Sequence, residues 1–419
     1  MDKRVLTVCL STENAHHGYF YADLSFPAKD YEIRDTLQRL RCTGHDDDPL
    51  ISEIRCEMLP ELSEVRLDAP TIKELDFYAR RLTVLSDAEQ LALRGVFLQY
   101  LNDATPDDLV SMKDLINMTY GLDQVTVVFN VGDDEALGQF VIENDLHQDV
   151  SAVPEESLYL LDKAAIGKQQ RSVDSGVYID GAYVVTGDYE MPEEYDGITL
   201  PETAPEAWYA FRIKVGSSTG GTEDTAEWID LPIRRPDANR IAQNHGETCI
   251  ENCVCFGFES SIPQITDRQF HDMKDFGKLN RLALMLADLA PEDLMRFKAV
   301  LELEAPTDMA GVMEAAHHHW DYSFADTLDD EDSYFKDYLR QYLPEGFDPN
   351  WLEDLSCQSE GNHLLRRLGG MVTEYGIIAG RGHNLYDLVP FREIAAEETN
   401  GTGFDETEAE EPRFGGMQL

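Results

Sequence analysis

Basic residues are scarce in this chain of 419 residues. It contains 34 Lys and Arg against 81 Asp and Glu, which gives a formal net charge of −47. The excess is not confined to one tail, because residues 1–206 contain 41 acids and 16 bases and residues 207–419 contain 40 acids and 18 bases. A field of this sign repels phosphates. We therefore expect no direct binding of nucleic acid.

Long apolar runs and a spaced cysteine framework are also missing. No apolar run approaches the ~18 residues that a membrane span needs. The stretch Val5–Leu10 is too short for a signal peptide and lacks a small-residue cleavage site. The cysteines are odd in number and unevenly placed, which is typical of a reducing compartment. They are Cys9, Cys42, Cys56, Cys249, Cys253, Cys255 and Cys357. These absences predict a cytoplasmic protein without a membrane span.

The sequence lacks a recognisable metal site. His317-His318-His319 are consecutive, so on a helix they point about 100° apart and cannot converge on one ion. Cys253 and Cys255 have no second ligand pair at zinc spacing, and we interpret them as buried strand residues. The acidic clusters lack the alternating ligands of an EF-hand loop. These clusters are Asp46-Asp47-Asp48, Asp133-Asp134-Glu135 and Asp329-Asp330-Glu331-Asp332. We expect no bound metal, and histidines that are exposed or partly buried on a helix.

Motifs of nucleophilic and nucleotide chemistry are missing as well. Gly216–Gly221 is rich in glycine but lacks the Gly-Lys-Ser/Thr ending of a phosphate-binding loop, so we interpret it as a hairpin loop. No Gly-x-Ser-x-Gly pattern surrounds Ser260 and Ser261. His16 and His17 have no Asp or Cys companion at a fixed spacing. The sequence therefore predicts neither an enzyme nor a cofactor.

The chain does contain an internal repeat. Apolar residues make up 42% of it, enough for folded cores. The segment Leu75–Leu82 recurs about 200 residues later as Leu279–Leu286. Apolar residues at i, i+4 and i+7 predict a helix with one buried face in each copy. A further leucine, an acidic turn and a second apolar helix follow in both copies.

The repeat extends on both sides of this helix. Three strands are expected in each copy, at Leu6–Leu10, Ala22–Pro27 and Ile51–Cys56 and at Phe211–Val215, Ile229–Ile233 and Ile250–Cys255. Downstream, Asp108–Asp114 and Tyr120 match Asp308–Glu314 and Trp320, while Gly167 and Gly176 match Gly361 and Gly370.

We predict an α+β fold, built as a tandem duplication of three small modules with an elongated shape and a strongly acidic surface. Each copy has a β-rich αβ module, a helical module and a short αβ module. The first copy comprises 1–66, 67–150 and 151–186, and a linker rich in Pro, Glu and Gly follows at 187–206. The second copy comprises 207–264, 265–345 and 346–392. An acidic tail at 393–419 has no periodicity and is expected to be disordered.

At these residues the chain resembles the ArdA antirestriction proteins. Leu279–Leu282 with the following Leu-Ala-Pro-Glu-Asp-Leu turn is similar to the helical middle domain of that family. Phe140–Asn144 and Val153–Gly167 resemble the end of that domain and the start of the third, and Gly176–Val184 resembles the last strand. The resemblance covers nearly all of the chain except linker and tail. The second copy departs from it at Lys336, Arg340 and Ser359–Arg367.

The resemblance implies a DNA mimic made by a mobile element in a bacterial host. Proteins of this family are elongated acidic dimers that occupy the DNA-binding groove of Type I restriction-modification enzymes. Because both copies here lie on one chain, we expect a pseudo-dimeric monomer, with a homodimer as the alternative. Linker residues Gly187–Glu206 would hold the copies at high effective concentration.

Carboxylates can replace phosphates in a DNA-binding groove, because arginine binds both bidentately. Duplex DNA carries one charge per ~1.7 Å, so forty-seven charges correspond to about 80 Å of duplex. The predicted partner contacts are acids away from the apolar helix faces and in the flanking loops. In the first copy they are Glu74, Asp76, Asp87, Glu89, Asp103, Asp107, Asp108, Asp114, Asp123, Asp133, Asp134, Glu135, Glu143 and Asp145. In the second copy they are Asp288, Glu292, Asp293, Glu302, Glu304, Asp308, Glu314, Asp326, Asp329, Asp330, Glu331 and Asp332.

The acidic composition also fits three origins that involve no restriction enzyme. Acidity of this kind occurs in proteins of salt-loving organisms, and it can serve solubility alone. The third alternative is an acidic binding module that sequesters another basic nucleic-acid-binding protein or a nuclease complex.

Overall fold

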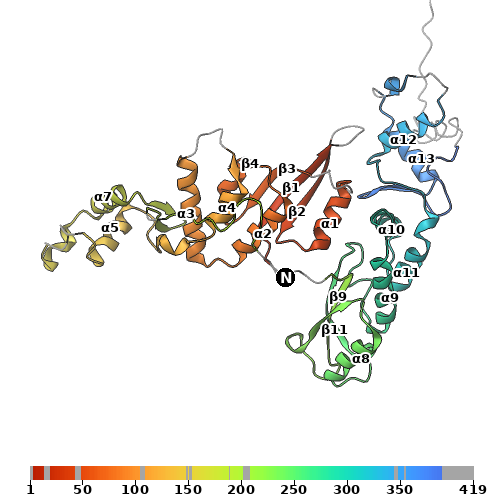
Figure 1. The fold of residues 1–419 in the computed structure, drawn as a ribbon, viewed down its shortest axis with the longest axis horizontal. Helices are drawn as coiled ribbons and strands as arrows, with labels where there is room; N and C mark the ends of the chain where they lie inside the picture. The colour runs from red at the N-terminus through yellow and green to blue at the C-terminus, as the bar shows by residue number, and fades with distance from the viewer. Residues whose placement is uncertain are drawn as a thin grey trace, which may run out of the picture. The chain divides into compact units, whose positions relative to one another are not determined.

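The computed structural model divides the chain into two compact units, Met1–Trp208 (unit 1) and Tyr209–Leu419 (unit 2) (Figure 1). It describes residues 3–13, 19–42, 49–103, 109–147, 150, 153–187, 189–201, 208–343, 348–352 and 355–388. Both units combine helices with small, mainly antiparallel sheets, which confirms the α+β class. None of the described helices is both long and apolar enough to cross a membrane. His16, His17, Asp46–Asp48, Asp107, Asp108 and the tail 393–419 lie outside the described residues.

Unit 1 begins with a three-stranded antiparallel sheet in the order β2-β1-β3. Its first elements are β1 Leu6–Glu13, β2 Tyr19–Phe26, α1 Asp30–Arg39, β3 Leu50–Cys56 and the 3-10 turn η1 Pro60–Glu64. A helical part follows, with β4 Leu67–Asp68, α2 Ile72–Thr83, α3 Asp87–Asp103, β5 Val110–Ser111 and α4 Met112–Met118. The third part contains η2 Leu122–Gln124, β6 Thr126–Val128, α5 Asp134–Glu143, η3 Glu155–Leu160, α7 Lys163–Asp174, β7 Val177–Ile179 and β8 Ala182–Val185.

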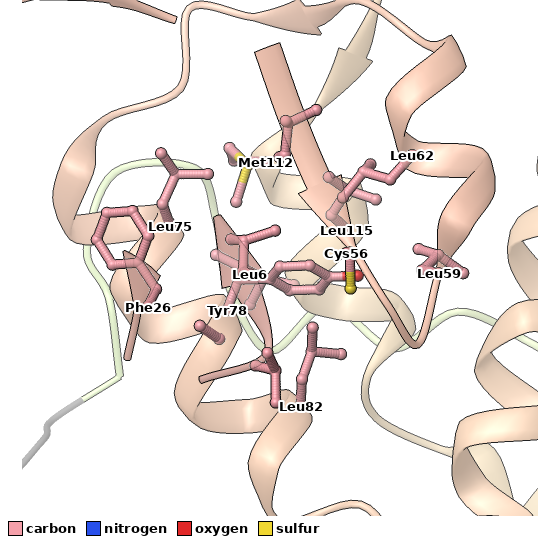
Figure 2. Packing of buried hydrophobic residues seen from close by; sticks show 14 of the residues in the cluster. Leu6, Phe26, Cys56, Leu59, Leu62, Leu75, Tyr78, Leu82, Met112 and Leu115 are labelled. Atoms are coloured by element: carbon pink, nitrogen blue, oxygen red, sulfur yellow. The ribbon is translucent and has the colours of Figure 1, made fainter. Parts of the chain in front are cut away.

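The sheet and helix α2 share the main core of unit 1. Alternation along β1 buries Leu6 and Val8, and the helical period of α2 buries Leu75, Tyr78 and Leu82. Figure 2 shows Leu6 of β1 packed with Leu75, Tyr78 and Leu82 of α2 and with labelled neighbours from the rest of the cluster. Each buried leucine stabilises the fold by roughly 1.5–3 kcal/mol. The predicted amphipathic helix is thus present, with its apolar face in the core.

Unit 2 has its α-helices and the strands of its three-stranded sheets in the same order, but its described residues contain no counterpart of β4 and β5. Its sheet and first helix are β9 Phe211–Gly216, η4 Glu223–Thr225, β10 Glu227–Leu231, α8 Arg235–Asn244, η5 Ile250–Asn252 and β11 Val254–Ser260. The helical part contains η6 Met273–Asp275, α9 Phe276–Ala287, α10 Pro291–Glu304 and α11 Met309–His318. The third part contains η7 His319–Asp321, β12 Phe324–Ala325, α12 Glu331–Arg340, η8 Pro349–Leu352, α13 Gln358–Arg367, β13 Met371–Thr373 and β14 Gly376–Ile378. Gly216–Gly221 ends β9 and enters the connection to β10, as predicted for a hairpin loop.

The two main sheets have the same order and the same register. Leu6 pairs with Phe26 and Cys56 in unit 1, as Phe211 pairs with Leu231 and Ser260 in unit 2. The third strand of each sheet has one irregularity at the same place, where the register skips Ser52 in β3 and Phe256 in β11. The small sheets β6-β8-β7 and β12-β14-β13 also have the same strand order and register. Val184 of β8 pairs with Val127 and Val177, and Ile378 of β14 pairs with Phe324 and Met371.

Two predicted matches are wrong in register. Ile250–Cys255 is not the third strand of its sheet, because Ile250–Asn252 forms a 3-10 turn and β11 runs over Val254–Ser260. The predicted match rests on the Ile and the Cys that both segments contain. In the sheets, Ile51 lies opposite Leu10 and Cys255 lies opposite Val215, so Cys255 corresponds to Ile51. The second error is a shift of three residues after the second helix. The helices begin after Ser111 and Asp308, whose side chains cap them, so Asp308 corresponds to Ser111 and not to Asp108.

Each unit packs a pair of helices closely in its third part. A Cβ atom at Gly167 of α7 would overlap the carbonyl oxygen of Asp134 in α5, and one at Gly361 of α13 would overlap that of Glu331 in α12. Only glycine allows backbones to approach in this way. The gap-free match of Gly167 with Gly361 therefore agrees with the packing of both helix pairs.

The predicted linker is not an extended connector in its described part. Residues 189–201, which we call the strap, pack on the helical part of unit 1. Tyr195 is 3% exposed, and the Asn117 side chain accepts its backbone N–H at 2.8 Å. The Asn117 amide donates to the Tyr195 carbonyl at 2.9 Å. The Pro, Glu and Gly content predicts a linker, but the segment also contains Tyr189 and Tyr195, which anchor it.

Candidate partner-binding surface

The structure separates the predicted contact acids into those that hold the fold together and those that face solvent. Asp76 belongs to the first group. It accepts the backbone N–H of Ala28 at 2.7 Å and forms an ion pair with Arg80 at 2.7 Å. In unit 2, Asn280 accepts the N–H of Ile233 at 2.8 Å in the same place. Asp76 is therefore a framework residue, and the prediction that it contacts a partner has no support from its surroundings.

Two further acids of unit 1 serve the interior of the unit. Asp134 binds Arg171 at 2.8 Å and accepts the Tyr178 hydroxyl at 2.8 Å. The Arg171 guanidinium, helped by Tyr178, lowers the pKa of Asp134 below its usual value. Asp114 accepts the hydroxyl of Tyr100 at 3.0 Å. These bonds tie neighbouring elements together, so their carboxylates are already committed within the fold.

Helix N-termini account for another set of predicted acids. Asp133, Asp308 and Asp330 each cap a helix by accepting a backbone N–H two or three residues into it. Glu74 and Glu89 close capping boxes with Thr71 and Ser86. Hydrogen bonds from Ser86 lower the pKa of Glu89. These acids stand where the helix dipole favours negative charge, which explains them without a partner.

In unit 2 most of the remaining predicted acids also bind partners within the unit. Three of them accept hydrogen bonds: Glu302 from the Gln264 side chain and the backbone N–H of Glu374, Glu304 from the Tyr322 hydroxyl, and Asp329 from the Ser333 hydroxyl. Three others form ion pairs: Asp293 with Arg296, Glu314 with Arg381, and Asp332 with Lys336. Lys336 is buried, and its ion pair with Asp332 at 2.7 Å joins two residues of α12. The acids of the cluster Asp329–Asp332 therefore serve mainly to begin helix α12.

The solvent-facing group is smaller. Seven predicted acids are exposed and have no hydrogen-bond or ion-pair partner for their carboxylates among the described residues; we call them the outer acids. They are Asp87, Asp103, Asp123, Glu135 and Asp145 in unit 1 and Asp288 and Glu292 in unit 2. Glu143 is exposed and bonded to Gln139 on its own helix, and Asp326 and Glu331 are half-buried.

The strap adds exposed acids in a segment whose composition predicts a linker. Glu190, Glu194 and Asp196 are exposed, and Glu193 pairs with Lys113 at 2.6 Å. The buried Tyr195 holds this row on the unit, because its hydroxyl also donates to Glu74 at 2.9 Å. Burial, and then Glu74, raises the pKa of Tyr195 to about 12. An aromatic residue inside an acidic stretch was the available signal for an ordered segment.

The solvent faces of the two main sheets differ in chemistry. In unit 1, Asp23 and Glu53 flank Cys9 in register, and Glu53 forms an ion pair with Arg55. In unit 2, the same positions hold Trp228, Gly257 and Lys214. Next to them, Arg212 lies over the rings of Tyr209 and Trp228 at 5.7 and 5.4 Å and pairs with Asp230 at 2.9 Å. This aromatic and cationic face interrupts the acidic surface of unit 2.

The described residues show no metal cluster of three or more His, Cys, Asp or Glu side chains. His317 is exposed and His318 half-buried, in line with the prediction, but His319 is fully buried. The prediction of two buried strand residues holds only in part: Cys253 is buried but lies outside a strand, at the end of η5, whereas Cys255 is in β11 but is half-buried. All seven cysteines carry free thiols.

Two depressions lie beside the edge strands of the main sheets. One, of about 750 Å³, is lined by β3 together with Val65, Leu67 and Leu109. The other, of about 590 Å³, is lined by β11 together with Ile262 and Phe270. The first lining includes the ion pair between Glu53 and Arg55, and the second includes Asp267 and His271.

No protein family, curated protein or solved structure matches this chain.

Proposed function

We propose that this protein is a DNA-mimicking antirestriction protein of the bacterial cytoplasm. In this proposal it occupies the DNA-binding groove of a Type I restriction-modification enzyme and inhibits it stoichiometrically. The supporting observation is the set of outer acids and strap acids, which a folded scaffold holds in solvent without ion pairs among the described residues, Glu193 excepted. A net charge of −47 provides the accompanying long-range field.

The mechanism of such an inhibitor is electrostatic substitution. A DNA-binding groove gains affinity when its Lys and Arg neutralise phosphates and release counterions. Carboxylates offer these side chains similar acceptors, and Arg binds them bidentately. They present no base edges, so they satisfy only the contacts that position DNA regardless of its sequence. One mimic can therefore block enzymes with different recognition sequences, and added salt weakens the complex.

The repeated register supports a further part of the proposal, namely that units 1 and 2 are tandem copies. The two main sheets, the two small sheets and the two glycine-mediated helix pairs correspond position by position. We propose that the copies together form one elongated, pseudo-dimeric mimic. Light scattering tests this directly: a mass near 47.4 kDa supports it, whereas twice that mass shows that the chain dimerises.

Stoichiometry tests the inhibitory mechanism. Inhibition by occupancy should titrate at a fixed ratio of inhibitor to enzyme and leave the DNA unchanged. Abolition of cleavage by substoichiometric protein would contradict occupancy. A pull-down from host lysate with partners identified by mass spectrometry separates the proposed target from the alternative, another basic nucleic-acid-binding protein or nuclease complex.

A further inference from the structure

A buried histidine occupies the junction between the helical part and the third part of unit 2. His319 opens the turn η7, directly after α11, and is 3% exposed. Its ring lies 4.7 Å from the ring of Trp320 and 6.2 Å from that of Phe297 in α10, which it meets edge-on. Two strand residues, Phe324 and Ala325, follow soon after and pair with β14. The imidazole is therefore part of the packing that leads into the small sheet.

The hydrogen-bonding environment of His319 favours the neutral form of its imidazole ring. Its Nδ1 lies 2.8 Å from the carbonyl oxygen of Ala316, which can only accept, so Nδ1 carries the proton. The other nitrogen, Nε2, is buried and has no partner among the described residues. A proton added at Nε2 would place a charged donor where no acceptor meets it. Burying such a charge without compensation is strongly unfavourable.

The charged groups around the ring do not compensate a positive charge. From α10, Asp293 favours the protonated ring and Arg296 opposes it, and these two side chains are 3.6 Å apart. On its own segment, His318 is bound to Asp321 at 2.9 Å, and Asp321 and Glu314 are both bound to Arg381. His317 bonds the carbonyl of Met313. Burial dominates this balance and lowers the pKa of His319.

Unit 1 carries leucine at the corresponding place. Leu122 follows α4 and precedes β6 as His319 follows α11 and precedes β12, and it is also buried. The site accepts an apolar side chain in one unit and a titratable one in the other. The packing of α11 and β12 therefore depends on the imidazole being uncharged, a condition that unit 1 does not have.

We propose that His319 is a pH-sensitive lock in unit 2, whose protonation in mild acid releases the α11–β12 junction and loosens β12 from β14. This regulation does not rest on the proposed function. An ordinary histidine titrates near pH 6.5. As the pH falls below that value, the opened junction takes up a proton before the closed one, so closure is lost progressively. At neutral pH both states are uncharged and the lock is closed.

Hydrogen exchange followed by mass spectrometry on the full chain tests the lock. Between pH 7.5 and 5.5, the open fraction of the junction at Phe324–Ala325 and Ile377–Ile378 should rise, by up to about tenfold for each pH unit below 6.5. The pair Val127–Val184 of unit 1, exchanging in the same sample, corrects for the intrinsic effect of pH. In H319L the rise should vanish, and in H383L, an exposed histidine, it should persist. Leu122→His should create the same response in unit 1. An equal response of both units in the wild type, or an unchanged rise in H319L, would overturn the proposal.

Discussion

The two units make one framework bond in the same place with different chemistry. Asp76 and Asn280 each accept the backbone N–H that follows a strand-ending proline. In unit 1 the acceptor is charged and binds Arg80, whereas in unit 2 it is a neutral amide. The fold needs the acceptor and tolerates the loss of the charge. An acidic residue on this scaffold is therefore evidence of partner binding only when the scaffold has no use for it.

A second difference concerns the sheet faces, which carry Asp23 and the Glu53–Arg55 ion pair in unit 1 and Trp228 in unit 2. The strap acids are likewise held by unit 1, since Asn117 and Tyr195 fix them there. Five of the seven outer acids also lie in unit 1. We expect unit 1 to contribute more of the binding to a basic groove.

The glycines of the helix pairs give the largest expected effect. Gly167→Leu and Gly361→Leu insert side chains where even a Cβ overlaps a backbone oxygen. Overpacking a well-packed site typically costs ~1–3 kcal/mol or more, so each variant should lose the α5–α7 or α12–α13 pair. Denaturant unfolding followed by circular dichroism measures the loss. Gly187→Ala, with no atom within 4 Å of the added Cβ, is the matched control. Similar stability of all three variants would contradict the shared packing.

The framework bond after the proline comes next. Asp76→Ala and Asn280→Ala should each destabilise their unit by ~1–3 kcal/mol, because a half-buried N–H loses its acceptor. Asp76→Asn should cost much less, since unit 2 uses that residue. Chemical denaturation of the three variants measures these differences. If D76N destabilises as strongly as D76A, the charge and not the hydrogen bond is what the framework needs.

The strap offers a comparison with unit 2, which has Glu314 where unit 1 has Asn117. Asn117→Ala removes the acceptor of two strap N–H groups and one donor, and should weaken strap attachment by ~1–3 kcal/mol. Limited proteolysis of residues 189–201 should accelerate accordingly. Substitution of the neighbouring Lys113 by Met, which removes only a surface ion pair, should leave cleavage nearly unchanged. Equal cleavage in wild type and N117A would contradict the anchoring role.

The outer acids should have the smallest effect on stability. Joint replacement of Asp87, Asp103, Asp123, Glu135 and Asp145 by their amides should change the free energy of unfolding by only ~0–1 kcal/mol while weakening binding of a basic partner. Replacing the capping acids Asp133, Asp308 and Asp330 by alanine should do the reverse, at ~1 kcal/mol per helix. Thermal unfolding and partner titration on both variants separate the two groups. Loss of binding in the capping variant alone would invert the assignment.

Much of the framework follows from the sequence, because apolar spacing and the repeat depend on core residues such as Leu75 and Leu279. The register errors arose where the two copies were matched by identical residues, as at Ile250. The true register follows from the residues that pack against the core, such as the partly buried Phe258. The roles of the acids could not be predicted in this way. The helix cap at Asp330 involves only neighbouring residues and is visible in the sequence. The hydrogen bonds and ion pair of Asp134 involve residues far along the chain, so the sequence does not distinguish an exposed carboxylate from one that is bonded within the fold.

Competition with DNA is the decisive test of mimicry. A fluorescently labelled duplex bound to the methyltransferase core of a Type I enzyme should be displaced by the protein at a fixed molar ratio, with loss of anisotropy and without change to the duplex. The variant lacking the five outer acids of unit 1 should displace it less well at equal stability. A ternary complex that retains the duplex, or no displacement by a folded protein at excess, would contradict DNA mimicry.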